Sequence, residues 1–156
     1  MKKMAKKVIA SMMSVATLAT SVVGISTNAA NTENNYFNNF SIQPYKGGWT
    51  RLNQTDFKTD DSWVYLYISS STRAARVHTL GVSMYNYSNY SVCTWDPSGA
   101  YCVAGPEYLI SNYIYEDGYR RADLEFYSVS DNYGDTISGA WSPDSYLETG
   151  HSYTYV

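Results

Sequence analysis

Apolar and polar side chains alternate with a period of two along several short stretches of the chain. In residues 62–70, one face is aliphatic and the other carries a row of rings, Trp63, Tyr65 and Tyr67. In residues 120–127, small and apolar side chains alternate with charged ones, which is the pattern of a strand with one face buried. The predicted strands are residues 40–45, 49–53, 62–70, 76–85, 91–95, 100–103, 108–115, 120–127, 136–141 and 152–156.

Groups of turn-forming residues separate these stretches, such as residues 96–99 (Asp-Pro-Ser-Gly) and residues 116–118 (Glu-Asp-Gly). Proline presets φ, glycine tolerates positive φ and aspartate bonds its own backbone, so such groups favour tight turns. About nine or ten short strands divided in this way predict an all-β fold, an antiparallel β-sandwich of the jelly-roll kind. We expect one domain, residues 30–156, in which the asparagine-rich residues 30–39 stay mobile before the first strand.

Residues 1–29 have the features of an export signal. Four lysines precede a moderately apolar stretch, residues 8–25, and small residues follow it. An uncleaved membrane anchor is the alternative, but the serine and threonine content and the small residues favour a signal peptide cleaved after Ala29 or Ala30. We therefore expect a secreted, extracellular protein with no stable membrane anchor, since no second apolar stretch follows.

Charge excludes two classes of partner. Four of the 11 basic residues lie in the leader and all 14 acidic residues lie after it, so the secreted chain would carry a net charge of −7. An acidic chain with no basic cluster argues against binding to nucleic acid and against docking on anionic membranes.

Aromatic residues dominate the chain after the leader. All 25 rings (17 Tyr, 4 Trp, 4 Phe) lie there, against 19 Ile, Leu, Val and Met residues, so a core must be built partly from rings. Two interpretations of the row Trp63, Tyr65 and Tyr67 stay open. The rings either pack within the sandwich and across strands, or form an outer face on which sugar rings stack.

The two cysteines, Cys93 and Cys102, flank a predicted hairpin. In an exported protein, a lone pair this close predicts one disulfide, and a two- or four-residue loop would set the two residues opposite each other. A type I turn over residues 96–99 with Gly99 left-handed instead gives a three-residue loop, which sets Cys102 opposite Thr94. We predict the disulfide because free thiols are rare outside the cell; two buried free cysteines are the alternative.

Acidic side chains gather in one loop, where Asp56, Asp60 and Asp61 form a candidate site for structural calcium. Calcium binds several converging oxygens, but acidic turn residues are also common without an ion. No other metal or cofactor is predicted, because His78 and His151 have no further ligands at zinc-site spacing.

Catalytic patterns are missing from the sequence, which has no nucleophile elbow and no glycine-rich phosphate loop. Four glutamates could meet in the folded chain as the carboxylate pair of a glycosidase, but any chain with 14 acidic residues offers such a pair. Those glutamates are Glu107, Glu116, Glu125 and Glu148. We therefore predict that the protein is not an enzyme.

Two short motifs resemble the opening and closing motifs of an uncharacterised family of small secreted Firmicutes proteins, a domain of unknown function. They are residues 38–45 (Asn-Asn-Phe-Ser-Ile-Gln-Pro-Tyr) and residues 137–145 (Ile-Ser-Gly-Ala-Trp-Ser-Pro-Asp-Ser). The resemblance implies export, a small β-rich domain and no known active site. In its composition the chain is also similar to small β-sandwich bacteriocins of the lactococcin 972 kind.

These features predict a secreted, non-enzymatic β-sandwich that binds a cell-wall glycan or a surface protein, with Trp63, Tyr65 and Tyr67 as the stacking residues. The first alternative is a bacteriocin-like antagonist of other bacteria, although membrane-active killers are usually cationic. The second alternative is a secreted hydrolase.

Overall fold

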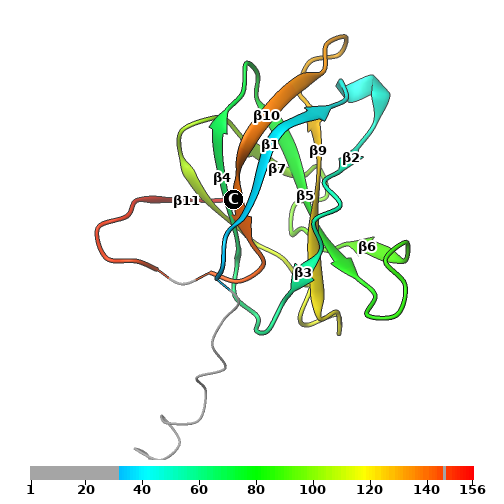
Figure 1. The fold of residues 1–156 in the computed structure, drawn as a ribbon, viewed down its shortest axis with the longest axis vertical. Helices are drawn as coiled ribbons and strands as arrows, with labels where there is room; N and C mark the ends of the chain where they lie inside the picture. The colour runs from blue at the N-terminus through cyan, green and yellow to red at the C-terminus, as the bar shows by residue number, and fades with distance from the viewer. Residues whose placement is uncertain (1–31, 146) are drawn as a thin grey trace, which may run out of the picture.

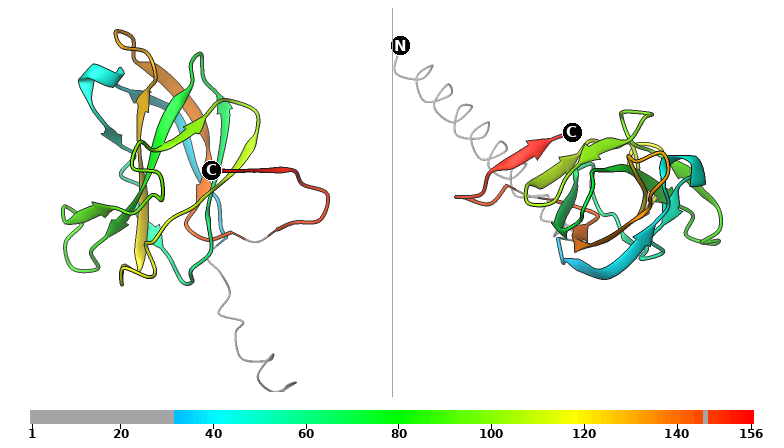
Figure 2. Two further views of the ribbon diagram at one scale, coloured as in Figure 1. Left: turned by 180° about the vertical axis from the view of Figure 1, so that it is seen from behind. Right: turned by 90° about the horizontal axis from the view of Figure 1, so that it is seen from above.

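The computed structural model describes residues 32–145 and 147–156 of the chain. The predicted signal peptide, residues 1–29, lies outside the described residues. Two β-sheets curl around a shared interior (Figures 1 and 2). Apolar side chains fill this interior. The predicted all-β, sandwich-like fold is therefore confirmed.

The first sheet has five strands in the order β1-β10-β4-β8-β11. Among the described strands of this sheet, only β11 and β8 pair in parallel, and the other pairs are antiparallel. The C-terminal strand β11 thus forms one edge of the sheet, beside β8 (Figure 1). The strands are β1 (Asn35–Ile42), β4 (Val64–Ser70), β8 (Glu107–Ile110), β10 (Asp135–Ser142) and β11 (Tyr153–Tyr155).

The second sheet is built around two long antiparallel strands, β5 and β9. β2 and β3 pair with β9, while β6 and β7 follow each other along the far edge of β5. The strands are β2 (Thr50–Arg51), β3 (Asp56–Phe57), β5 (Ala75–Val82), β6 (Tyr90–Val92), β7 (Ala100–Cys102) and β9 (Arg121–Ser128), and a short 3₁₀ helix, η1 (Tyr45–Gly47), precedes β2.

The core lies between the sheets and combines aliphatic and aromatic side chains. Leu66 of β4 and Trp141 of β10 face Leu124 and Phe126 of β9, and all four are fully buried. The ring of Phe37 lies 5.9 Å from that of Phe126, between the centroids, and ties β1 to the second sheet. The expectation that rings supplement a scarce aliphatic core is thereby confirmed.

The first strand begins earlier than the sequence predicted. β1 starts at Asn35, so half of the lead-in expected to be mobile, residues 30–39, is strand. The physical reason is that β10 provides a long antiparallel partner and that Phe37 is only 3% exposed. A bulge follows Phe37, and Asn39 takes a positive φ of 51° within it, which asparagine tolerates better than most residues.

The predicted disulfide is wrong, because both cysteines are buried and free. β6 and β7 pair with β5 rather than with each other: the Cys93 amide donates to the Thr79 carbonyl (2.9 Å), and Cys102 lies opposite Ala75. Four strand residues separate those positions by about 13 Å, and a disulfide needs Cα atoms within about 7 Å. The turn itself forms as expected, with the Gly99 amide donating to the Asp96 carbonyl (2.9 Å).

We expect the two thiols to stay unlinked and unreactive in the folded protein. Burial raises the pKa of Cys93 to about 11 and that of Cys102 to about 12, so little thiolate is available near neutral pH. The intact mass should be the same with and without reductant. A thiol reagent should modify both cysteines only after denaturant is added. An unreduced mass lower by two hydrogens would contradict this expectation.

Candidate functional site

The row of rings predicted on β4 lies on the outer face of the first sheet, while the alternate side chains of β4 fill the core. Trp63, directly before β4, is 37% exposed, and Tyr65 and Tyr67 are half-buried. The Trp63 ring meets that of Tyr155 on β11 edge-on, with 5.1 Å between centroids. The rings are therefore not part of the interior layer, and two pockets flank them.

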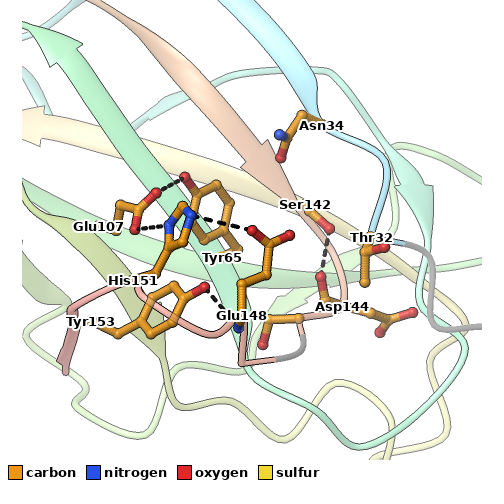
Figure 3. A pocket seen from close by; sticks show the side chains of 10 residues that line it. Thr32, Asn34, Tyr65, Glu107, Ser142, Asp144, Glu148, His151 and Tyr153 are labelled. Atoms are coloured by element: carbon orange, nitrogen blue, oxygen red, sulfur yellow. Dashed lines mark hydrogen bonds and ion pairs between the residues drawn. The ribbon is translucent and has the colours of Figure 1, made fainter.

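The first pocket, here called the histidine pocket, has a volume of about 180 Å³ and lies between β4, β8 and the C-terminal segment (Figure 3). Its walls are mostly polar. Tyr65 and Glu107 come from the sheet, and Glu148, His151 and Tyr153 come from the segment that leads into β11. Thr32, Asn34, Ser142, Asp144 and Ser145 complete the lining.

His151 links two glutamates across this pocket (Figure 3). Its Nδ1 lies 2.9 Å from Glu107 Oε2, and its Nε2 lies 3.3 Å from Glu148 Oε2. The second oxygen of Glu107 accepts a hydrogen bond from the Tyr65 hydroxyl at 3.0 Å. The backbone amide of Glu148 donates to the Tyr153 hydroxyl at 3.2 Å. These bonds fix the C-terminal segment against β4 and β8.

The ionisation of the pocket follows from these contacts. The hydrogen bond and negative charge of Glu107 raise the pKa of His151 above its ordinary value, and Glu148 adds to the effect. Burial raises the pKa of the Tyr65 phenol, and Glu107 raises it further. Near neutral pH the pocket therefore holds a neutral phenol that donates to Glu107, and the imidazole is biased toward its charged form.

The second pocket, here called the tryptophan pocket, has a volume of about 170 Å³. It lies at the other end of the ring row, and Trp63, Trp95 and Tyr113 line it. The rings of Trp95 and Tyr113 pack at 4.8 Å between centroids, and Trp95 is 65% exposed. Asp61, Ser62, Ser111, Asn112 and Glu116 supply the polar part of the lining.

The candidate calcium residues do not converge. Asp56 accepts a hydrogen bond from the Asn35 side chain (2.8 Å), and Asp60 accepts one from the Ser62 amide (2.9 Å). Asp61 instead lines the tryptophan pocket. Within residues 32–145 and 147–156, no group of three or more His, Cys, Asp or Glu side chains is arranged to hold a metal ion. The same residues include no helix that is long and apolar enough to cross a membrane.

The four glutamates considered as a carboxylate pair divide among three places. Glu107 and Glu148 meet at His151, Glu116 lines the tryptophan pocket, and Glu125 bonds His78 in the second sheet at 3.0 Å. Sequence reasoning did not find the site at His151, because Glu107 lies 44 positions away and no local pattern joins them. The available signal was the recurrence of tyrosines in the predicted strands, with Tyr65 in residues 62–70 and Tyr153 in residues 152–156.

Comparison with known proteins identifies a family that covers most of the chain. A family model described as a protein of unknown function (DUF2712) matches residues 25–145. The chain belongs to the DUF2712 family. No curated protein and no solved structure matches the chain significantly. The resemblance to a domain of unknown function is thus confirmed at the level of the family.

The DUF2712 match includes β1 to β10 and ends at Ser145. The tryptophan pocket lies wholly within the matched residues, and so do Tyr65 and Glu107. Glu148, His151 and Tyr153 lie beyond them, so the histidine pocket joins the DUF2712 domain to the C-terminal segment of this chain.

Proposed function

We propose that this protein is an extracellular, non-enzymatic binding module whose ligand is a hydroxyl-rich polymer such as a cell-wall glycan, bound at the histidine pocket. The observation that carries the proposal is the combination of accessible rings and carboxylates in one open pocket. Tyr65 and Tyr153 supply the rings, and Glu107 and Glu148 supply the carboxylates.

The chemistry of a sugar matches this lining. A sugar ring has an apolar face that packs on an aromatic ring, and its hydroxyls donate hydrogen bonds to carboxylates. The Glu148 side chain is 47% exposed and that of His151 is 44% exposed, so both can reach a ligand. A protein with a net charge of −7 after its leader would favour a neutral or cationic polymer over a polyanion.

Co-sedimentation with purified Gram-positive cell walls and with insoluble polysaccharides tests the proposal. Tyr65→Ala removes a ring and the hydroxyl bonded to Glu107, and we expect it to weaken saturable binding about tenfold. Tyr133→Ala is the matched control, because Tyr133 is 64% exposed and lines neither pocket. Equal binding by the two folded variants would contradict the assignment of the site.

A hydrolase is a second candidate, favoured by the meeting of Glu107 and Glu148 at His151. Carboxylate pairs perform acid–base chemistry on glycosidic bonds, and a histidine with a raised pKa can deliver a proton. The release of new reducing ends from the bound polysaccharide, abolished by Glu148→Gln, would establish this candidate over the binding module.

A further inference from the structure

The two pockets lie on one continuous outer surface of the first sheet. Tyr65 lines the histidine pocket and Trp63 lines the tryptophan pocket, and they occupy successive outward positions at β4. On the neighbouring strand β8, Glu107 belongs to the histidine pocket, and Ser111, just past the strand, belongs to the tryptophan pocket. The lining residues of the two pockets are thus two positions apart on β4 and four positions apart on β8, which corresponds to about 7 to 13 Å along the strands.

Aromatic side chains cover the surface of the first sheet between the two pockets. Leu109 lies midway between Glu107 and Ser111 in the register, opposite Tyr65 on one side and Tyr155 on the other. Tyr155 is 54% exposed and its ring contacts that of Trp63. The surface from one pocket to the other is therefore lined by accessible rings and is not interrupted by a charged side chain of β8.

The size of each pocket limits what it can hold. Sites that bury a drug-sized ligand have volumes of about 300–1,000 Å³. The two pockets measure about 180 and 170 Å³, so each accommodates one small unit of a ligand. Both combine rings with carboxylates, Glu107 and Glu148 in one and Asp61 and Glu116 in the other, and so offer the same chemistry to successive units.

We propose that the two pockets are subsites for one linear, uncharged or cationic polysaccharide that runs along the outer face of β4 and β8. This inference rests on the proposed function and specifies its ligand: a chain of sugars longer than a disaccharide. The tryptophan pocket adds affinity only when the ligand is long enough to reach it from the histidine pocket. Trp95 can distinguish ligands that reach the tryptophan pocket from shorter ones that do not, because it lines only this pocket and is well exposed.

Titration of the purified protein with β-1,4-linked N-acetylglucosamine oligomers, from the disaccharide to the hexasaccharide, tests the inference. The affinity should rise with length. Trp95→Ala should weaken binding of the hexasaccharide about tenfold and leave the disaccharide unchanged, whereas Tyr65→Ala should weaken both. Glu116→Gln provides a second variant of the tryptophan pocket that keeps every ring in place.

Each result decides between the proposals. If the disaccharide and the hexasaccharide bind equally to the unmodified protein, or if Trp95→Ala weakens both equally, the two-subsite inference is overturned and the proposed function stands. If no oligomer binds, and the protein also fails to bind cell walls, the proposed function is overturned together with this inference. Circular dichroism and thermal unfolding of each variant confirm that the fold is retained.

Discussion

Replacing Lys58 by methionine is expected to destabilise the protein by about 3–5 kcal/mol, a large part of the stability of a typical domain. The side chains of Lys58 and Asp144 are both 0% exposed, with 2.9 Å between Nζ and Oδ1. The ammonium also donates to the carbonyls of Ser62 (2.6 Å) and Pro143 (2.8 Å). Methionine retains the volume of the side chain and removes all three bonds.

The loss of stability in Lys58→Met arises from the buried carboxylate of Asp144, which remains in the variant. Burial acts to raise the pKa of Asp144, but the Thr59 hydroxyl and the Lys58 ammonium together lower it below the ordinary value. Without Lys58, the buried carboxylate loses its cationic partner, and the hydroxyl and amide of Thr59 that still donate to it carry no charge. An uncompensated buried charge is far more costly than the intact pair is stabilising.

The pH dependence distinguishes this mechanism from a simple packing defect. In the unmodified protein the folded-state pKa of Asp144 is depressed, so its contribution is complete above about pH 4 and is lost as the pH falls through the folded-state pKa. In Lys58→Met, protonation of Asp144 removes the buried negative charge that has lost its ammonium partner. The difference in unfolding free energy between the two proteins should therefore shrink as the pH falls toward 4.

Urea unfolding between pH 4 and pH 8 measures the effect. Lys46→Met is the matched control, because Lys46 is exposed, and it should change stability by less than about 0.5 kcal/mol. The double variant Lys58→Met/Asp144→Asn should recover part of the loss, since asparagine is neutral and can still accept from Thr59. A loss that does not depend on pH, or no recovery in the double variant, would contradict the charge-based explanation.

The fold class was predictable because alternation with a period of two is a local property. β4 shows it clearly, because its apolar residues face the core. The apolar residues of β9 also face the core, but Asp123 and Glu125 on its other face are buried as well, so the prediction that only one face is buried is wrong there. The predicted boundaries of both strands differ from the observed ones by one or two residues. The predicted strand over residues 108–115 instead ends at Ile110, because the Asn112 side chain accepts from the Ile114 amide (3.3 Å) and begins a turn. A polar residue can therefore fit the alternating pattern of a strand and still end the strand, when its side chain bonds the nearby backbone.

Strand pairing was not predictable, and the cysteines show why. The sequence places Cys93 and Cys102 on either side of a good turn, and a local hairpin is the natural expectation. The tertiary structure offers both flanking strands a longer partner in β5, so each pairs with it separately. Strand pairing depends on which strand edges are available in the whole sheet, and the residues near the turn do not determine which partner each flanking strand takes.

Part of the candidate site was predictable because it depends on local alternation, and the rest was not because it depends on long-range strand pairing. The outward direction of Trp63, Tyr65 and Tyr67 follows from the burial of the alternate residues of β4. Glu148, His151 and Tyr153 of the histidine pocket come from the C-terminal segment, which lies beside Tyr65 and Glu107 because β11 pairs with β8 in parallel. Such long-range additions leave no periodic signal in the sequence.

Gly139→Ala is expected to have the other large effect, a destabilisation of about 3 kcal/mol or more, at the upper end of the range for overpacked cores. Gly139 lies in the middle of β10, with β1 on one side and β4 on the other. A Cβ atom there would overlap the backbone carbonyl oxygen of Tyr67 and would lie 2.8 Å from Cζ of Phe37. The Tyr67 carbonyl belongs to the backbone and cannot rotate away, and the Phe37 ring is packed against the ring of Phe126.

Relief of the clash would require β10 to separate from β4, next to the bulge that already interrupts their register between Ser138 and Gly139. Thermal and urea unfolding of Gly139→Ala measure the loss, and Thr136→Ala serves as the control because Thr136 is exposed on the same strand and should cost less than about 1 kcal/mol. Since the clash is with main chain, the larger Gly139→Ser should be at least as unstable as Gly139→Ala. Near-native stability in either variant would mean that β4 and β10 can move apart at this point, and the close approach would then not explain the glycine in the closing motif.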